Sequence, residues 1–147
     1  MSTAAHVSLS ARQESLIADL NLIPDPHERL SVLVCRAGSN RLPDALKTDD
    51  ALVKGCVSRV WLRGELDGGR CRFRCEADSP LVKGLVALLC ELYSGALPDE
   101  VIAVEPEVWL RCGFMRLLSP TRLNGLSAVR NRIRELATAM SEGASAE

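Results

Sequence analysis

A cysteine lies between a glycine turn and a β-prone segment in residues 52–62, which read LVKGCVSRVWL. Gly55 permits a tight backbone turn that a residue with a Cβ resists, and the segment after Arg59 is apolar and rich in β-favouring residues. Cys56 is therefore expected on a loop that a sheet holds in place, which is a common position for a reactive residue. Lys54 and Arg59 flank the thiol and would favour its nucleophilic thiolate form if their side chains turned toward it.

The residues around this thiol leave two interpretations open. Cys56 is either a nucleophile or a small buried hydrophobe, the role that free cysteines usually play in a core. The sequence holds six cysteines, but it lacks a Cys-x-x-Cys pair, and its two histidines, His6 and His27, lie far in sequence from the cysteine cluster. A structural zinc site and a resident cofactor are therefore not expected.

Composition predicts a single globular domain. The 147 residues include 47% hydrophobic and 25% charged residues and carry a net charge of -1, values typical of one domain with one core. This charge balance gives no general attraction to nucleic acid or to an anionic membrane. The aromatic content of 3% also offers few platforms for base stacking.

The sequence also predicts the cellular location of the protein. No apolar run is long enough to span a bilayer, and residues 1–8 lack the basic start and apolar middle of a secretory signal. We therefore expect a cytoplasmic protein without membrane or nucleic-acid partners, whose cysteines are free thiols rather than disulfides.

Two helices are predicted at the N-terminus, after a flexible tail over residues 1–9. Ser10 and Gln13 match a capping box, in which each side chain satisfies an orphan amide at a helix start. Pro26 suits the first position of a second helix, and Gly38 suits the left-handed residue that ends it. The stretch between this helix and the cysteine motif has no regular period and is expected to form a loop.

A β-hairpin is predicted next, with its turn at residues 67–69, Asp-Gly-Gly. In the return strand Cys71, Phe73 and Cys75 alternate with arginines and Glu76, which is typical of a strand with one buried and one solvent-facing side. We therefore expect Cys71 and Cys75 to lie in the core. A metal-binding pair is the alternative interpretation.

The C-terminal half is predicted to be helical. Asp78 or Ser79 can cap a helix that has Pro80 at its first position. Regularly spaced leucines make this the expected central core helix, with Cys90 at the margin of its apolar face. Short helical or irregular pieces follow, and a last helix opens near Pro120.

The order of these elements predicts an α+β domain over residues 10–140. In this domain a small antiparallel sheet is packed on one side by helices. Residues 141–147 are expected to form a polar tail.

Four motifs stand out along the chain. They read VKGCVSRVW, ADSPLVKGL, YSG and LSPTRLNGL, and they begin at positions 53, 77, 93 and 118. Together and in this order they resemble the motifs of the SufE family of sulfur-acceptor proteins. The resemblance covers most of the chain and implies an α+β fold like that of the U-type iron–sulfur scaffold proteins. It also implies two partners, a cysteine desulfurase that carries pyridoxal phosphate and an iron–sulfur scaffold complex that receives the sulfur.

The resemblance assigns three residues to the expected site. The family's acceptor cysteine falls on Cys56 in a Gly-Cys-x-Ser motif, and the arginine of its Ser-Pro-x-Arg motif falls on Arg122, which would lie near the acceptor loop and support the thiolate. Asp78 matches an aspartate before the central helix. It is expected to cap that helix and to support the loop that carries Cys56. The chain would then be a covalent sulfur carrier that takes persulfide sulfur from the desulfurase and stimulates it, not a stand-alone enzyme.

The sequence departs from the family pattern at Val57, where glutamine is usual, and in two loops near the expected partner surface that are shorter than usual. Two alternatives stay open: a protein that activates a desulfurase by binding alone, and a scaffold for a metal or cluster. The residues do not identify the desulfurase, the scaffold or the oligomeric state. They also leave open whether Cys35, Cys90 or Cys112 is reactive.

Overall fold

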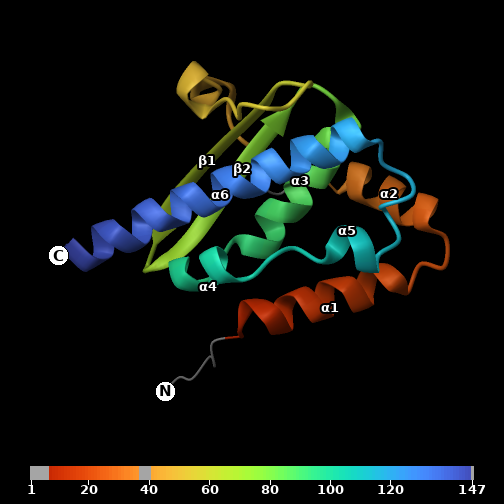
Figure 1. Cartoon of the computed structure of the whole chain (residues 1–147), viewed down its shortest axis with the longest axis horizontal. Coiled ribbons are helices and arrows are strands. Elements are labelled where there is room, and N and C mark those ends of the chain that lie inside the picture. The colour runs from red at the N-terminus through yellow and green to blue at the C-terminus, as the bar shows by residue number, and fades with distance from the viewer. Residues whose placement is uncertain (1–6, 37–40, 147) are drawn as a thin grey trace.

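The computed structural model describes residues 7–36 and 41–146, so Gly38, expected to end the second helix, lies outside the described residues. The α+β class is confirmed, because a two-stranded antiparallel sheet packs against helices (Figure 1). Helix α3 lies between the hairpin and the N-terminal helices, and the long α6 runs beside the hairpin (Figure 1). The elements are α1 (Leu9–Asn21), α2 (Pro26–Cys35), the short 3-10 helices η1 (Asp44–Leu46) and η2 (Asp49–Ala51), β1 (Val60–Asp67), β2 (Arg70–Ala77), α3 (Pro80–Tyr93), α4 (Pro98–Ala103), α5 (Val108–Arg111) and α6 (Pro120–Ala146).

The hairpin has the predicted strands and turn. Its register runs from Val60 opposite Ala77 to Asp67 opposite Arg70. Both glycines of the turn have positive φ angles, a conformation that residues with a Cβ rarely adopt. The Asp-Gly-Gly sequence therefore fixes the register, and with it the side of the sheet to which each side chain points.

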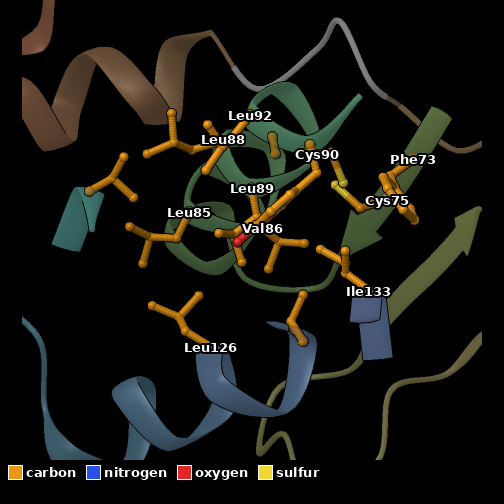
Figure 2. Close-up of a cluster of buried hydrophobic side chains, with 14 of the residues drawn as sticks. Phe73, Cys75, Leu85, Val86, Leu88, Leu89, Cys90, Leu92, Leu126 and Ile133 are labelled. Atoms are coloured by element: carbon orange, nitrogen blue, oxygen red, sulfur yellow. The ribbon is translucent and has the colours of Figure 1, made fainter. Parts of the chain in front are cut away.

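The inner face of the hairpin belongs to the core, as predicted. Cys71, Phe73 and Cys75 are each at most 2% exposed. Figure 2 shows Cys75 beside Cys90 of α3 within the cluster of buried side chains. A hydrogen bond with Cys75, together with burial, raises the pKa of Cys90. Cys90 is therefore a neutral thiol inside the core. The sequence had predicted it at the margin of the apolar face of the central helix.

The outer face of the hairpin is partly covered, whereas the sequence predicted a solvent-facing side. Glu76 is only 7% exposed, because it forms ion pairs with Lys83 of α3 at 3.0 Å and with Arg41 at 3.5 Å. Nearby, Trp61 packs in a second, smaller apolar cluster against the loop that precedes β1. The end of the hairpin next to the cysteine motif is therefore enclosed on both sides.

Helix α3 is the central helix, as predicted, and nine of its residues are buried. Its cap is Ser79, whose hydroxyl accepts a hydrogen bond from the Val82 N–H. Asp78 is not the cap, because its carboxylate pairs with Arg59 instead. A Cβ at Gly84 would lie 3.1 Å from backbone atoms of α2, so a glycine at this position lets the two helices pack closely.

The first helix begins earlier than the sequence predicted. Its cap is Ser8, whose hydroxyl accepts a hydrogen bond from the Ala11 N–H at 3.1 Å, so the capping box expected at Ser10 does not form. The reason is tertiary packing, since Leu9 is fully buried in the core and joins the helix. Gln13, the expected second member of the box, is buried and bonds to the backbone between α4 and α5.

The last helix is longer than predicted. It continues to Ala146, through residues expected to form a polar tail. Ser141, on this extension, donates a hydrogen bond to the Asp99 carboxylate of α4 at 3.0 Å, which ties the extension to a neighbouring helix. Within the described ranges, no helix combines the length and apolar character that crossing a membrane requires.

Candidate functional site

The cysteine loop, residues 53–59, leads into β1 and is fixed at its base. The Val53 N–H donates to the Val60 carbonyl at 2.8 Å, and the Asp78 N–H donates to the Arg59 carbonyl at 3.1 Å. The Arg59 guanidinium also pairs with the Asp78 carboxylate, with Nε 2.7 Å from Oδ2. The two ends of the loop are therefore held by β1 and by the segment that precedes α3.

The tip of the cysteine loop packs on α6. Gly55 has a φ of 93°, and a Cβ there would lie 3.3 Å from the Cβ of Ala128, so both the backbone conformation and the close approach favour glycine. Cys56 is half-buried, and its thiol donates a hydrogen bond to the Gly125 carbonyl at 3.4 Å. The thiol therefore points inward, toward α6, and not into solvent.

Cys56 lines a cavity of about 170 Å³. This cavity lies between the cysteine loop, α3 and the first turns of α6, and Figure 2 shows several of its apolar side chains between the two helices. Apolar side chains of this kind disfavour charge on the thiol that lies beside them. The apolar lining comes from Val82, Leu85, Val86, Leu126 and Val129.

Burial raises the pKa of the Cys56 thiol, because an apolar environment disfavours the charged thiolate. In this position the thiol is therefore neutral at pH 7. The sequence predicted that Lys54 and Arg59 would favour the thiolate if their side chains turned toward it, and that condition is not met in this arrangement. Lys54 is exposed, and Arg59 is bound to Asp78, so burial dominates.

Trp61, the second residue of β1, contacts two cations beside the base of the cysteine loop. The Lys47 ammonium lies 4.7 Å from the ring centroid, and the Arg59 guanidinium carbon lies 5.3 Å from it. Such contacts are attractive because the face of an indole ring carries partial negative charge. Arg59 therefore has two partners, Asp78 and Trp61, that hold this end of the loop.

The residues expected at the site take different places. Arg122 is half-buried in the first turn of α6 and lines the same cavity as Cys56, whereas Asp78 lies at the base of the cysteine loop. The Ser119 hydroxyl accepts a hydrogen bond from the Arg122 N–H at 3.2 Å, which fixes this turn of the helix.

Gly125, whose carbonyl accepts the hydrogen bond from the Cys56 thiol, was not predicted as a site residue. A glycine inside a helical pattern often marks a close approach of another segment, and this signal could have identified it.

The other cysteines differ from Cys56 in exposure. Cys35 is exposed, and Cys71, Cys75, Cys90 and Cys112 are buried. Burial raises the pKa of Cys71 to about 11 and also raises the pKa of Cys112. Buried cysteines of this kind are usually unreactive, so Cys56, beside a cavity on a loop, is the candidate nucleophile.

Comparisons with known proteins identify relatives of this chain. A family model described as "SufE: Fe-S metabolism associated domain" matches residues 14–137. The chain is 39% identical over 99 residues to a chloroplastic quinolinate synthase of Oryza sativa subsp. japonica, a match that covers 66% of this chain and 14% of that protein. It is 39% identical over 92 residues to SufE-like protein 1, chloroplastic/mitochondrial, of Arabidopsis thaliana, which covers 60% of this chain and 25% of that protein. The matches thus span a quarter or less of these two relatives.

A solved structure supports the same fold. The solution structure of a hypothetical protein from Thermus thermophilus aligns with a TM-score of 0.72 at 21% sequence identity. The alignment covers 89% of this chain and 96% of that chain. The likeness in fold therefore extends over most of the chain.

Proposed function

The chain belongs to the SufE family, whose domain has a role in iron–sulfur metabolism with sulfur transfer, and on that premise we propose that Cys56 accepts sulfur from a cysteine desulfurase as a persulfide. The chain stimulates the desulfurase in this way and passes the sulfur on for iron–sulfur cluster assembly. The observation that carries the proposal is the place of Cys56, a half-buried thiol beside an apolar cavity on a loop with a fixed base.

The transfer is a thiol–disulfide exchange in which a sulfane sulfur is the group that moves. The Cys56 thiolate attacks the outer sulfur of the donor persulfide, and a new sulfur–sulfur bond forms on Cys56. The bond between the outer and inner sulfur of the donor breaks, and the donor cysteine leaves as a thiolate. The proton lost from Cys56 balances the charge on that thiolate, so the exchange needs no external oxidant or reductant.

The loop must move before this attack. In the cavity the Cys56 thiol is neutral, because burial raises its pKa, and a neutral thiol is a poor nucleophile. Outward movement of the tip returns the thiol to water, lowers the pKa and exposes the sulfur to the donor. The hydrogen bond to Gly125 opposes this movement only weakly, because a thiol is a weak donor.

The same cavity gives the product a protected place. Once the tip returns, the terminal sulfur of a Cys56 persulfide lies in this largely apolar cavity, where stray thiols reach it less readily than in open solvent. The base of the loop stays fixed because Arg59 pairs with Asp78, and this guides the tip back to the same position in the cavity. Asp78 then acts as loop support, since Ser79 caps α3.

The proposal is tested by intact mass measurement of the wild-type chain. The chain is incubated with a pyridoxal phosphate-dependent cysteine desulfurase and free cysteine, then analysed without reductant. We expect the mass to rise by one sulfur atom and peptide mapping to place that atom on Cys56. A sample without free cysteine is the control. Sulfur found on the exposed Cys35 and not on Cys56, or no gain at all, would contradict the proposal.

Arg122 is proposed to support the Cys56 thiolate as the tip leaves the cavity, because both residues line the same cavity. Replacing Arg122 with alanine is expected to slow sulfur transfer at saturating desulfurase about tenfold, since about 1.4 kcal/mol of lost charge interaction corresponds to that factor. Arg122→Lys should retain part of the rate. The measurement is the single-turnover rate of sulfur gain as a function of pH.

The pH profile separates support of the thiolate from a structural role. Without the cation the charged thiolate is less favoured, so the midpoint of the profile should move to higher pH in Arg122→Ala. Arg132→Ala is the matched control, because Arg132 lies on the same helix and pairs with Glu135 at 3.1 Å. Transfer at the wild-type rate in Arg122→Ala would remove the role proposed for this side chain.

A further inference from the structure

Val57, the neighbour of Cys56, exposes an apolar side chain at the mouth of the cavity. It is 85% exposed, more than any other large hydrophobic side chain in the described part of the chain. Adjacent Cα atoms are about 3.8 Å apart, so a donor whose sulfur bonds to Cys56 must also cover Val57. A partner that reaches the thiol therefore meets this side chain.

We propose that Val57 is a docking contact for the sulfur donor, a cysteine desulfurase that presents an apolar surface around its persulfide-bearing cysteine. This inference rests on the proposed function and adds to it the chemistry of the partner surface. In the resting loop the Cys56 thiol points inward to Gly125, while Val57 is open to solvent. The donor therefore contacts Val57 before the thiol is released.

The surroundings of Val57 define the partner surface further. Lys54 is exposed on one side of the tip, and Arg122 lines the cavity that Val57 and Cys56 share. An exposed apolar side chain with a lysine three residues earlier in the same loop and an arginine in the adjoining cavity fits an apolar socket with acidic groups at its edge. Such an edge directs association by charge, while the buried apolar contact sets the lifetime of the complex.

The Val57 side chain has no polar group that a partner would have to satisfy when it is buried, so the surface that it fits is apolar. Because its side chain is largely free of contacts within the chain, substitutions at Val57 are expected to leave the fold intact.

The test compares wild type with Val57→Asp and Val57→Ile in sulfur transfer from a desulfurase, measured over a range of chain concentrations. A charge in an apolar contact weakens binding, so we expect Val57→Asp to raise the half-saturating concentration about tenfold or more, with a smaller effect on the plateau rate. Val57→Ile should stay within about twofold of wild type, because isoleucine preserves the apolar contact. Leu22→Asp is the matched control, since Leu22 is 80% exposed beyond the end of α1, and it should match wild type.

A second measurement separates docking from an effect on the loop itself. Alkylation of Cys56 by iodoacetamide, without any partner, reports how often the tip releases the thiol. The new carboxylate raises the pKa of the neighbouring thiol, so the rates are compared at equal thiolate fraction, from the pH dependence of alkylation. Docking predicts that, compared in this way, wild type and Val57→Asp are alkylated at the same rate. A changed alkylation rate with an unchanged half-saturating concentration would show that Val57 acts inside the loop, and would overturn the docking proposal.

Failure of this inference can be distinguished from failure of the proposed function. If wild type gains no sulfur on Cys56, the acceptor function fails, and calorimetric binding of the desulfurase to wild type and Val57→Asp still tests docking. Weaker binding of the aspartate variant then supports the contact, and equal binding overturns it. If wild type gains sulfur and the two chains transfer with the same half-saturating concentration, docking through Val57 fails while the acceptor function stands.

Discussion

Replacing Cys56 with serine is expected to reduce sulfur gain from a desulfurase to the background measured without free cysteine. A serine hydroxyl stays protonated at neutral pH and is a far weaker nucleophile than a thiolate. The change is nearly isosteric, and a hydroxyl can still donate to the Gly125 carbonyl that holds the thiol. The fold and the resting position of the loop should therefore be retained. Intact mass without reductant measures the sulfur gain, and alanine release measures desulfurase turnover.

Cys35→Ser is the matched control, because Cys35 is exposed and outside the cavity. It should accept sulfur on Cys56 as wild type does. Two results would change the assignment. Undiminished sulfur gain in Cys56→Ser would move the acceptor to another cysteine. Full stimulation of the desulfurase by Cys56→Ser, without sulfur gain, would leave the alternative of an activator that acts by binding alone.

Replacing Phe73 with alanine is expected to lower the free energy of unfolding by about 3–5 kcal/mol. Phe73 is fully buried on β2 and faces Gly64 on β1, where a Cβ would lie 2.8 Å from the ring. The ring therefore covers a strand position that has no side chain of its own, and its loss leaves a cavity between the sheet and the helices. Domains of this size are stable by about 5–15 kcal/mol, so the loss is a large fraction. The midpoint of urea unfolding measures it.

Phe73→Leu tests whether the loss follows the volume removed. Leucine fills much of the same space, so the decrease should be clearly smaller than in Phe73→Ala. Leu22→Ala, at an exposed position, should stay within about 0.5 kcal/mol of wild type. A decrease below about 1 kcal/mol in Phe73→Ala would mean that the core repacks around the vacated position.

The parts of the fold that the sequence predicted well are those set by local patterns. Alternation along the return strand identified Cys71 and Cys75 as core residues, and the Asp-Gly-Gly turn fixed the hairpin. The leucine spacing after Pro80 identified the central helix. These signals are strong because a strand buries alternate residues and a helix buries one face, whatever packs against them.

The errors came from contacts between segments that are distant in the chain. Glu76 is buried because Lys83 and Arg41 pair with it, which alternation within one strand does not reveal. The first helix starts at Leu9 because the core takes up that side chain. A local pattern could not decide between Ser8 and Ser10 as the cap, since both are serines ahead of an apolar stripe.

The roles of the candidate site residues stay predictions, but their arrangement can be compared with the expectation. The family resemblance implied that Arg122 lies near the loop of Cys56, and both residues line one cavity. The sequence suggested that neighbouring cations favour the thiolate, yet proximity in sequence does not fix the direction of a side chain. Arg59 turns to Asp78, and burial then decides the pKa of the thiol.

The contact of Arg59 with Trp61 makes the base of the cysteine loop observable by tryptophan fluorescence. The chain has two tryptophans, and the other, Trp109, is 9% exposed and packs against Phe114, with ring centroids 6.4 Å apart. Indole emission shifts when a nearby charge moves, so the fluorescence of Trp61 reports whether Arg59 keeps its place, against the background of the buried Trp109. Unchanged emission of the unlabelled protein in a stopped-flow instrument during sulfur transfer means that the base of the loop holds while the tip opens, and a change means that the opening reaches Arg59.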